Sequence, residues 1–299
     1  MRALLLAAVL VTALGCSVKR YAVNRLGDAL ASSGTTFASD DDPELVGEAL
    51  PFALKLIESL LAESPRHQGL LLAAVSGFAQ YSYAFVQQPA DELEDEDLAQ
   101  ALRLQNRARK LHLRGRDYGL RGLEVRHRGF EKALRADAKA AMWAASRRDV
   151  PLLYWTAAAW GSAISLSKDD PETVADQPLV EALIDRALEL DEAFDHGAIH
   201  SFLVSYEPSR PGGAGDAADR ARKHFERALE LSAGKLASPL VAFAETVSLS
   251  QQNRKEFEAL LQRALAIDVD ARPEWRLANL LTQRRARWLL GRTDELFLE

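Results

Sequence analysis

The stretch between residues 151 and 167 carries no charged side chain, and it constrains the fold more than any other part of the sequence. Pro151 suits the first turn of a helix, where its missing N–H costs nothing, and Pro171 provides a break after the stretch. Apolar and small residues cover every side of the predicted helix, so no face suits water. The run is too short and too rich in Ser and Thr for a typical membrane span. We therefore expect a buried central helix with other helices packed around it.

The composition favours an all-α protein. Hydrophobic residues make up 48% of the 299 residues, Gly (17) and Pro (11) are sparse, and long segments with strand-type alternation are missing. Such a sequence predicts helices around a sizeable core. The formal net charge of −6 does not favour binding to nucleic acid.

The N-terminus has the pattern of a secretory signal. Arg2 is followed by an apolar stretch that ends in Ala13-Leu14-Gly15-Cys16. This ending resembles a bacterial lipobox, although Ala13 stands where Leu is usual. We expect residues 1–15 to be a signal peptide and Cys16, the only cysteine, to be acylated as the mature N-terminus. Each buried methylene of the acyl chains contributes ~0.8 kcal/mol to membrane binding. The alternative is a plain signal peptide with a chance cysteine.

After the anchor, residues 16–42 should form the lipidated N-terminus, a first helix over 19–31 and a loop over 34–43. Asp42 before Pro43 predicts a helix start, with a capping carboxylate and then proline at the first position. Helices are expected over 44–63 and 68–88, and residues 43–299 should form a single helical domain. Ser17 is not an Asp, which in a double-membrane cell predicts sorting to the outer membrane.

Internal repeats appear after the central stretch. The same helix ending recurs as Ala187-Leu-Glu-Leu190, Ala228-Leu-Glu-Leu231 and Ala264-Leu-Ala-Ile267. The middle copy, with Ala221 and Phe225 ahead of Ala228, matches the second helix of a tetratricopeptide repeat, whose period is about 34 residues. We therefore predict a right-handed array of antiparallel, tetratricopeptide-like helix hairpins around the central helix. A helix over 273–290, with many Arg on its outer side, would be the terminal cap.

Two charged segments lie between the first helices and the central stretch. Residues 91–97 contain six carboxylates, and residues 103–128 contain nine Lys or Arg. The simplest interpretation is mutual compensation, with acids near helix starts and bases near helix ends and on solvated faces. A basic face that docks a partner is the alternative.

The motifs of common enzymes are missing, and neither a cofactor nor a metal is expected. There is no Gly-x-Ser-x-Gly, His-Glu-x-x-His, phosphate loop or Gly-x-Gly-x-x-Gly. The glycine-rich segment 212–215 precedes a helix but lacks the following Lys and Ser/Thr, which indicates a turn. His196 and His200 would share one helical face, yet no third ligand for zinc is evident.

Six aromatic residues are candidates for an apolar ligand site: Tyr81, Tyr83, Phe85, Tyr154, Trp155 and Trp160. At 100° per residue, Tyr81 and Phe85 share one helix face and Tyr83 lies nearly opposite. Trp155 and Trp160 point about 140° apart, so at least one of them should lie in the core. Tyrosine suits a cavity wall because its ring can be buried while its hydroxyl orients a polar group. The alternative is that both faces pack against neighbouring helices.

Several short motifs occur in order along nearly the whole mature chain. They are Gly15-Cys16-Ser17, Asp40-Asp-Asp-Pro-Glu-Leu-Val46, Pro65-x-His67-x-x-Leu-Leu-Leu72, Gly77-Phe78-x-x-Tyr81-x-Tyr83-Ala84-Phe85, Arg116-Asp-Tyr-Gly-Leu120, Asp149-Val-Pro-Leu-Leu-Tyr-Trp155, Trp160-Gly161 and Arg276-Leu-x-Asn279. In this combination the chain resembles the T component of tripartite ATP-independent periplasmic (TRAP) transporters, the TatT family. The resemblance implies a periplasm-facing lipoprotein of cryptic tetratricopeptide-like hairpins, assembled as a homotrimer with a pore or cleft for an apolar ligand. It also implies pairing with the solute-binding P subunit.

The function expected from these features is that of a non-enzymatic, lipid-anchored scaffold in a TRAP transport system. It would help to capture or hand over a small, partly apolar organic solute. The alternative is a general tetratricopeptide-type envelope lipoprotein that docks peptides or assembly factors. An envelope hydrolase is a third hypothesis, for which no nucleophile and base can be nominated.

Overall fold

The computed structural model describes residues 23–30 and 34–297, and this part of the chain is helical without a strand. The expected all-α class is confirmed. Residues 23–30 form a helical segment. The elements up to the central helix are α2 (Gly34–Ala38), α3 (Pro43–Glu63), α4 (Gln68–Ser82), the π-helix η1 (Tyr83–Gln87), α5 (Gln88–Leu93), α6 (Leu98–Arg126), α7 (Phe130–Ala136), α8 (Ala138–Ala141), and the 3₁₀ turns η2 (Met142–Ala144) and η3 (Arg147–Asp149).

The central helix is α9 (Val150–Ser165), and the remaining elements follow it along the chain. They are α10 (Pro171–Val174), α11 (Gln177–Leu190), η4 (Phe194–Gly197), α12 (Ala198–Tyr206), η5 (Glu207–Ser209), α13 (Ala217–Leu231), α14 (Ser238–Phe243), the π-helix η6 (Ala244–Ser248), α15 (Arg254–Leu265), η7 (Pro273–Trp275), α16 (Arg276–Gly291) and α17 (Thr293–Leu296).

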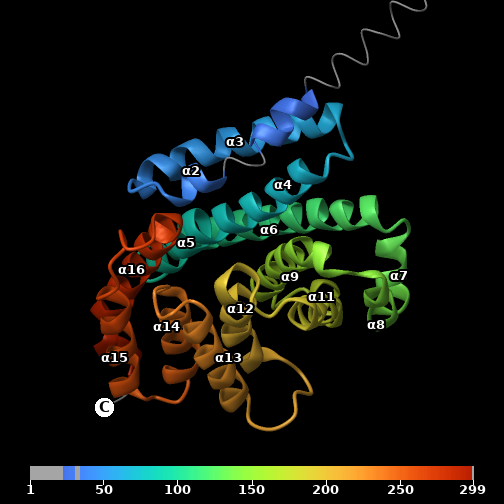
Figure 1. Cartoon of the computed structure of the whole chain (residues 1–299). Coiled ribbons are helices and arrows are strands. Elements are labelled where there is room, and N and C mark those ends of the chain that lie inside the picture. The colour runs from blue at the N-terminus through green and yellow to red at the C-terminus, as the bar shows by residue number, and fades with distance from the viewer. Residues whose placement is uncertain (1–22, 31–33, 298–299) are drawn as a thin grey trace, which may run out of the picture.

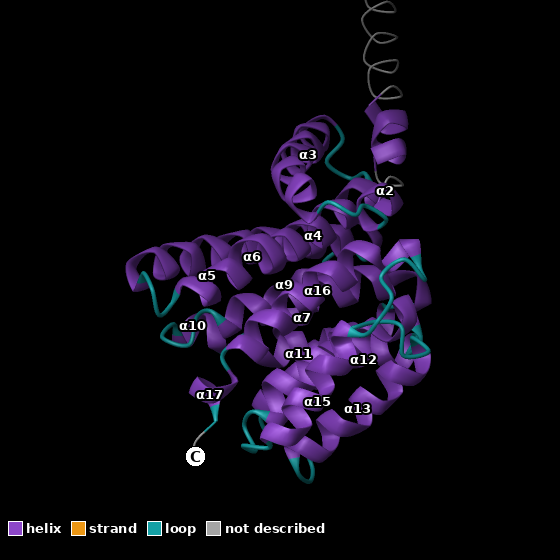
Figure 2. Ribbon diagram, turned by 90° about the vertical axis from the view of Figure 1, so that its left-hand side faces the viewer, coloured by secondary structure: helices purple, strands orange, loops and turns teal. Residues whose placement is uncertain are grey.

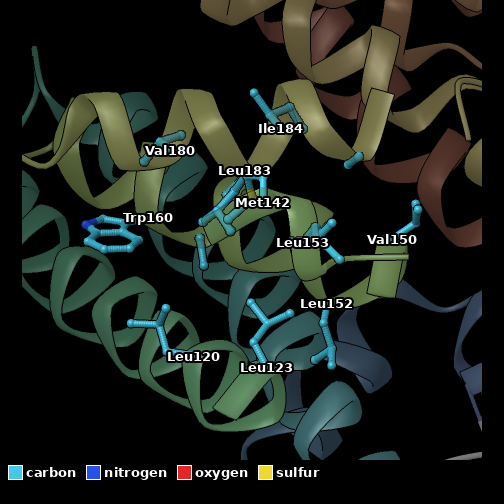
Figure 3. Packing of buried hydrophobic residues seen from close by; sticks show 14 of the residues in the cluster. Leu120, Leu123, Met142, Val150, Leu152, Leu153, Trp160, Val180, Leu183 and Ile184 are labelled. Atoms are coloured by element: carbon cyan, nitrogen blue, oxygen red, sulfur yellow. The ribbon is translucent and has the colours of Figure 1, made fainter. Parts of the chain in front are cut away.

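Helix α9 lies in the middle of the molecule, as the charge-free stretch predicts. It packs against α4, α6, α11 and α12. Leu153, Ala157 and Trp160 have no exposed surface, and Figure 3 shows Trp160 among apolar residues of neighbouring helices. The burial is not uniform, however, because Tyr154 and Trp155 are half-buried and Ser165 is exposed.

The crossing of α6 and α9 is unusually close at Gly119. A Cβ atom added to Gly119 would lie 2.1 Å from the Oγ1 atom of Thr156, which is fully buried in α9. Only glycine leaves room for this approach. The Thr156 hydroxyl is held by the backbone of its own helix, since it donates a hydrogen bond to the carbonyl of Leu152.

The alanines of the repeated helix ending are all core residues. Ala187, Ala228 and Ala264 have no exposed surface in α11, α13 and α15. Phe225 of α13 contacts Phe243 of α14, with ring centroids 4.7 Å apart. The helices α12 to α16 share a second apolar core beside the one around α9.

Helix α16, near the C-terminal end of the described chain, meets helices near its N-terminal end. Helix α16 contacts α2 and α3 as well as α14 and α15, and Figure 1 shows α16 in red beside α5. Figure 2, which faces this side of the molecule, shows α16 with α2 above it and α15 below it. Helix α16 therefore joins the C-terminal helices to the N-terminal ones, and Arg285, one of the arginines expected on the outer side of a terminal cap, is buried.

Several predicted boundaries hold and two are wrong. Asp42 caps α3, since its Oδ1 atom accepts a hydrogen bond of 2.9 Å from the backbone N–H of Leu45. The loop expected over 34–43 contains α2, because packing of this segment on η7 and α16 overrides its loop-like composition. The helix expected over 68–88 runs on to Leu93, but with the π-turn η1 inside it. The wide turn precedes Pro89, whose ring would clash with a carbonyl in a regular α-turn.

The run Gln68–Leu93 is long and apolar enough to cross a membrane, but half of its most apolar window is buried inside the structure. Its hydrophobicity is therefore that of a core helix, which packs on α3, α6 and α9. Cys16 and the signal peptide lie outside the described residues, as do the ends of the helix expected over 19–31.

Candidate functional site

Two π-helical segments lie where the N-terminal and the C-terminal helices meet. In η1 the backbone N–H of Gln88 bonds to the carbonyl of Tyr83, and in η6 the N–H of Leu249 bonds to the carbonyl of Ala244 at 3.0 Å. Such single wide turns inside helices are frequent at functional sites. One side chain of each turn, Tyr83 in η1 and Glu245 in η6, interacts electrostatically with Arg285 of α16.

Arg285 is the centre of this cluster. Its side chain is only 8% exposed, and its Nη2 atom lies 3.1 Å from the Oδ2 atom of Asp91 in α5. The Nε atom donates a hydrogen bond of 3.2 Å to the Oε1 atom of Glu245. The guanidinium lies over the ring of Trp288, with 4.3 Å between its carbon and the ring centroid. We call Tyr83, Gln88, Asp91, Glu245, Arg285 and Trp288 the α5–α16 seam.

The charges in the seam do not balance, since one guanidinium serves two carboxylates. Burial raises the pKa of Asp91 to about 6; Arg285 opposes this effect and Glu245 adds to it. Burial alone would lower the pKa of Arg285, but Glu245 and Asp91 raise it overall. The Nη1 atom of Arg285 is buried and finds no hydrogen-bond partner within the described part of the chain.

Tyr83 is partly exposed to solvent, yet its hydroxyl group is desolvated by the surrounding protein. The residue keeps 46% of its surface exposed. Even so, surrounding protein groups raise the pKa of its hydroxyl by desolvation, and Glu245 raises it further. Arg285 and Gln88 oppose this rise in pKa. The ring is thus reachable from solvent while the hydroxyl end lies among the polar groups of the seam, an arrangement suited to binding a molecule with apolar and polar parts.

The seam is flanked by exposed ion pairs between the same two segments. Arg284 donates to Glu92 at 3.0 Å, and Arg292 pairs with Asp95. Three carboxylates of the acidic run, Asp91, Glu92 and Asp95, thus pair with arginines in or directly after α16 rather than with the basic segment 103–128. Arginines of that segment pair with other helices, as Arg114 does with Glu58 of α3.

A second aromatic cluster lies on α9. The rings of Tyr154 and Trp155 are 4.9 Å apart, and Tyr154 also contacts Phe194 at 5.4 Å. Burial raises the pKa of Tyr154. Phe194 begins a turn in which Asp195, His196 and Gly197 all have positive φ angles of 44°, 54° and 94°.

This left-handed turn is strained at its two non-glycine residues. It directs His196 onto Trp275, with ring centroids 4.8 Å apart. His200 lies in α12, where its Nδ1 atom is 2.9 Å from that of His224. The prediction that His196 and His200 share one helical face is therefore wrong, because the chain leaves helical geometry between Phe194 and Ala198. The described residues contain no group of three or more metal-ligating side chains.

The six predicted aromatic residues occupy four different surroundings. Tyr81 and Phe85 stack at 5.9 Å, and Phe85 lies against Gly47 of α3. Tyr83 lies at the seam, while Tyr154 and Trp155 form the cluster with Phe194. Trp160 is in the core, with the guanidinium groups of Arg116 and Arg135 at 5.2 and 5.7 Å from its ring.

Sequence reasoning did not select the other members of these clusters. They are Gln88, Asp91, Glu245, Arg285, Trp288, Phe194 and Trp275. In the sequence, Asp91 and Arg285 are only parts of charged segments, and no sequence signal pairs them.

Comparison with known proteins matches nearly the whole described chain, both clusters included, to one family. A family model described as "TRAP transporter T-component" matches residues 39–297. A protein of Treponema pallidum (strain Nichols) with the name "Uncharacterized protein" is 30% identical over 306 residues, which covers 95% of this chain and 94% of that protein.

Proposed function

The chain belongs to the TRAP transporter T-component family, and we propose that it is a non-enzymatic scaffold that binds the solute-binding P subunit of a TRAP system. The match to residues 39–297, which spans almost the whole described chain, carries this proposal. Membership implies a role in a TRAP transport system and association with its other subunits. The P subunit is the partner that our proposal selects, because it carries the solute.

The ligand in this proposal is a small, partly apolar organic molecule. Tyr83, Tyr154 and Trp155 keep accessible aromatic surface. The α5–α16 seam adds polar groups beside Tyr83, which would orient a hydroxyl or carbonyl of the ligand. Trp160 has no exposed surface, so its contribution would be to hold α9 in place.

The helices after α9 support a tetratricopeptide-like interpretation. The alanines at the repeated positions are fully buried, as close helix pairing requires. A Cβ atom on Gly197 would lie 3.2 Å from the Cα atom of Ala228, so the turn before α12 packs directly on α13. We propose that these helices form hairpins of this type and that copies of the chain assemble as a homotrimer.

Anchoring through Cys16 is the third part of the proposal. The apolar leader ending in Gly15-Cys16 supports acylation of this cysteine and a position facing the periplasm, on the outer membrane. Cell fractionation of a Cys16→Ser variant tests it. The anchor proposal fails if the variant stays as tightly bound to membranes as the wild type.

Crosslinking in intact cells tests the partner. The protein is purified from solubilised membranes after crosslinking, and mass spectrometry identifies both crosslinked proteins and retained small molecules. We expect crosslinks to a periplasmic solute-binding subunit and a small organic molecule that is lost on unfolding. Crosslinks to envelope assembly factors or peptides alone would favour the docking lipoprotein instead.

A further inference from the structure

Helix α3 is apolar on two opposite sides. Leu54, Ile57 and Leu61 are buried against the body of the molecule. Leu45 and Phe52 point away from it, with 56% and 75% of their surfaces exposed. These two residues are two turns apart and therefore lie on the same side of the helix. An outward apolar stripe of this kind marks a contact surface.

The described chain begins beside this helix. The segment 23–30 is fixed to the end of α3 because the hydroxyl of Ser64 donates a hydrogen bond of 2.8 Å to the side chain of Asn24. Leu26 of this segment is half-exposed. Figures 1 and 2 show α3 and the segment in one outer layer, on the far side of α4 and α6 from α9.

The distance along the chain limits where the membrane can be. Cys16 precedes Val23 by a few residues only, and even a fully extended chain spans no more than about 3.5 Å per residue, or roughly 25 Å in all. The 21 residues of α3 form a helix of similar length, about 32 Å. A lipid on Cys16 would therefore keep this layer close to the bilayer.

We propose that the outer stripe of α3, with Leu45 and Phe52 as its main residues, rests on the bilayer and inserts these side chains into the interface. This inference depends on the proposed anchor at Cys16. Glu44, Glu48 and Glu63 are exposed on the same helix, and its one lysine, Lys55, pairs with Glu58, so attraction to anionic lipid does not explain the contact. Apolar insertion explains a surface that is hydrophobic without being basic, and it makes the contact independent of salt and of anionic lipid.

Fluorescence depth measurement on the lipidated full chain tests the contact. Lipidation consumes the only native thiol, so a Phe52→Cys variant can be labelled with an environment-sensitive dye and reconstituted in phosphatidylcholine vesicles. We expect blue-shifted emission and several-fold stronger quenching by nitroxide-labelled lipid than for Trp143→Cys. Trp143 is the matched control, because it is 79% exposed in η2, a turn that packs on α11.

A second tether separates this inference from the anchor itself. Replacing residues 1–16 with a hexahistidine tag and adding nickel-chelating lipid holds the protein on vesicles without acylation. Quenching at position 52 in this sample supports the membrane contact even if Cys16 proves unmodified in cells. The inference is overturned if position 52 remains as water-exposed as position 143 on both tethers. It is also overturned if the blue shift arises without vesicles at high protein concentration, or only when a P subunit is added.

Discussion

The guanidinium of Arg285 lies 3.1 Å from the carboxylate of Asp91 and joins the last long helix of the chain to a short helix near its beginning. Exposed pairs such as Arg284 with Glu92 continue the same contact. The connection holds the C-terminal helices against the N-terminal ones. Replacing the buried Arg285 should therefore show what this contact contributes to stability, apart from the effect of the exposed ion pairs.

Replacing Arg285 with Gln should lower the free energy of unfolding by about 2–4 kcal/mol. The change leaves Asp91 and Glu245 without their shared cation in a poorly solvated place, and breaking a buried pair on one side is costly. Urea denaturation at pH 7.5 measures the effect. The matched control is Arg284→Gln, which removes a half-exposed ion pair and should cost about 1 kcal/mol or less. Equal losses in the two variants would show that the buried pairs of Arg285 stabilise the fold no more than the exposed pair of Arg284.

The seam should also make stability depend on pH. The folded state raises the pKa of Asp91 from 3.8 to about 6, so it binds a proton more tightly than the unfolded state does. This contribution to stability is therefore present below about pH 4 and is lost as the pH rises to about 6, with a ceiling of about 3 kcal/mol. The Asp91→Asn variant should lack this loss. Urea denaturation of both proteins between pH 4 and 7 measures it, and parallel pH profiles would contradict it.

The two tryptophans of α9 should differ in their effect on stability. Trp160 has no exposed surface, whereas Trp155 is half-buried. Trp160→Ala should cost about 3–5 kcal/mol, because it leaves a large cavity in the core. Trp155→Ala should cost clearly less and serves as the control on the same helix. Thermal and urea denaturation give the comparison, and an equal loss in both variants would show that Trp155 is just as much a core residue.

The close crossing of α6 and α9 predicts coupling between Gly119 and Thr156. Gly119→Ala would gain about 1 kcal/mol of helix propensity in isolation, but its methyl group would overlap the Oγ1 atom of Thr156. We therefore expect net destabilisation. Adding Thr156→Ala removes the overlapping atoms and should restore part of the loss. A double-mutant cycle in urea measures this coupling, and additive effects would contradict the steric explanation.

The central helix and the entry to α3 could be predicted because their signals are local. A stretch without charge has to be buried, and an Asp-Pro pair has few roles other than starting a helix. The alanines of the repeated ending were equally informative, because small residues at fixed spacing indicate close helix pairing. In each case the side chains that decide the structure lie within a single helix or at its start.

The seam could not be predicted because its parts are far apart in the sequence. Asp91 and Arg285 each lie in a charged segment, which by itself indicates a solvated surface. The turn η1 adds a residue to one helical turn, so a regular 100° spacing does not extend through Gln87 to Asp91. The left-handed turn at His196 likewise interrupts the helical spacing expected between His196 and His200.

The ligand hypothesis predicts different outcomes for two tyrosines that are close in sequence. Tyr83→Phe keeps the accessible ring but removes the hydroxyl that meets the polar groups of the seam. We expect a nearly unchanged melting temperature and less small molecule retained on purification. Tyr81→Phe is the control, because that buried hydroxyl already accepts a hydrogen bond of 3.1 Å from Arg107. Its loss should cost about 1 kcal/mol of stability and leave the retained molecule unchanged. Mass spectrometry of the purified variants quantifies the retained molecule, and crosslinking quantifies the P subunit. Wild-type levels of both in Tyr83→Phe would show that this hydroxyl has no part in the site. A loss in Tyr81→Phe alone would move the site to Tyr81 and its neighbours Phe85 and Arg107.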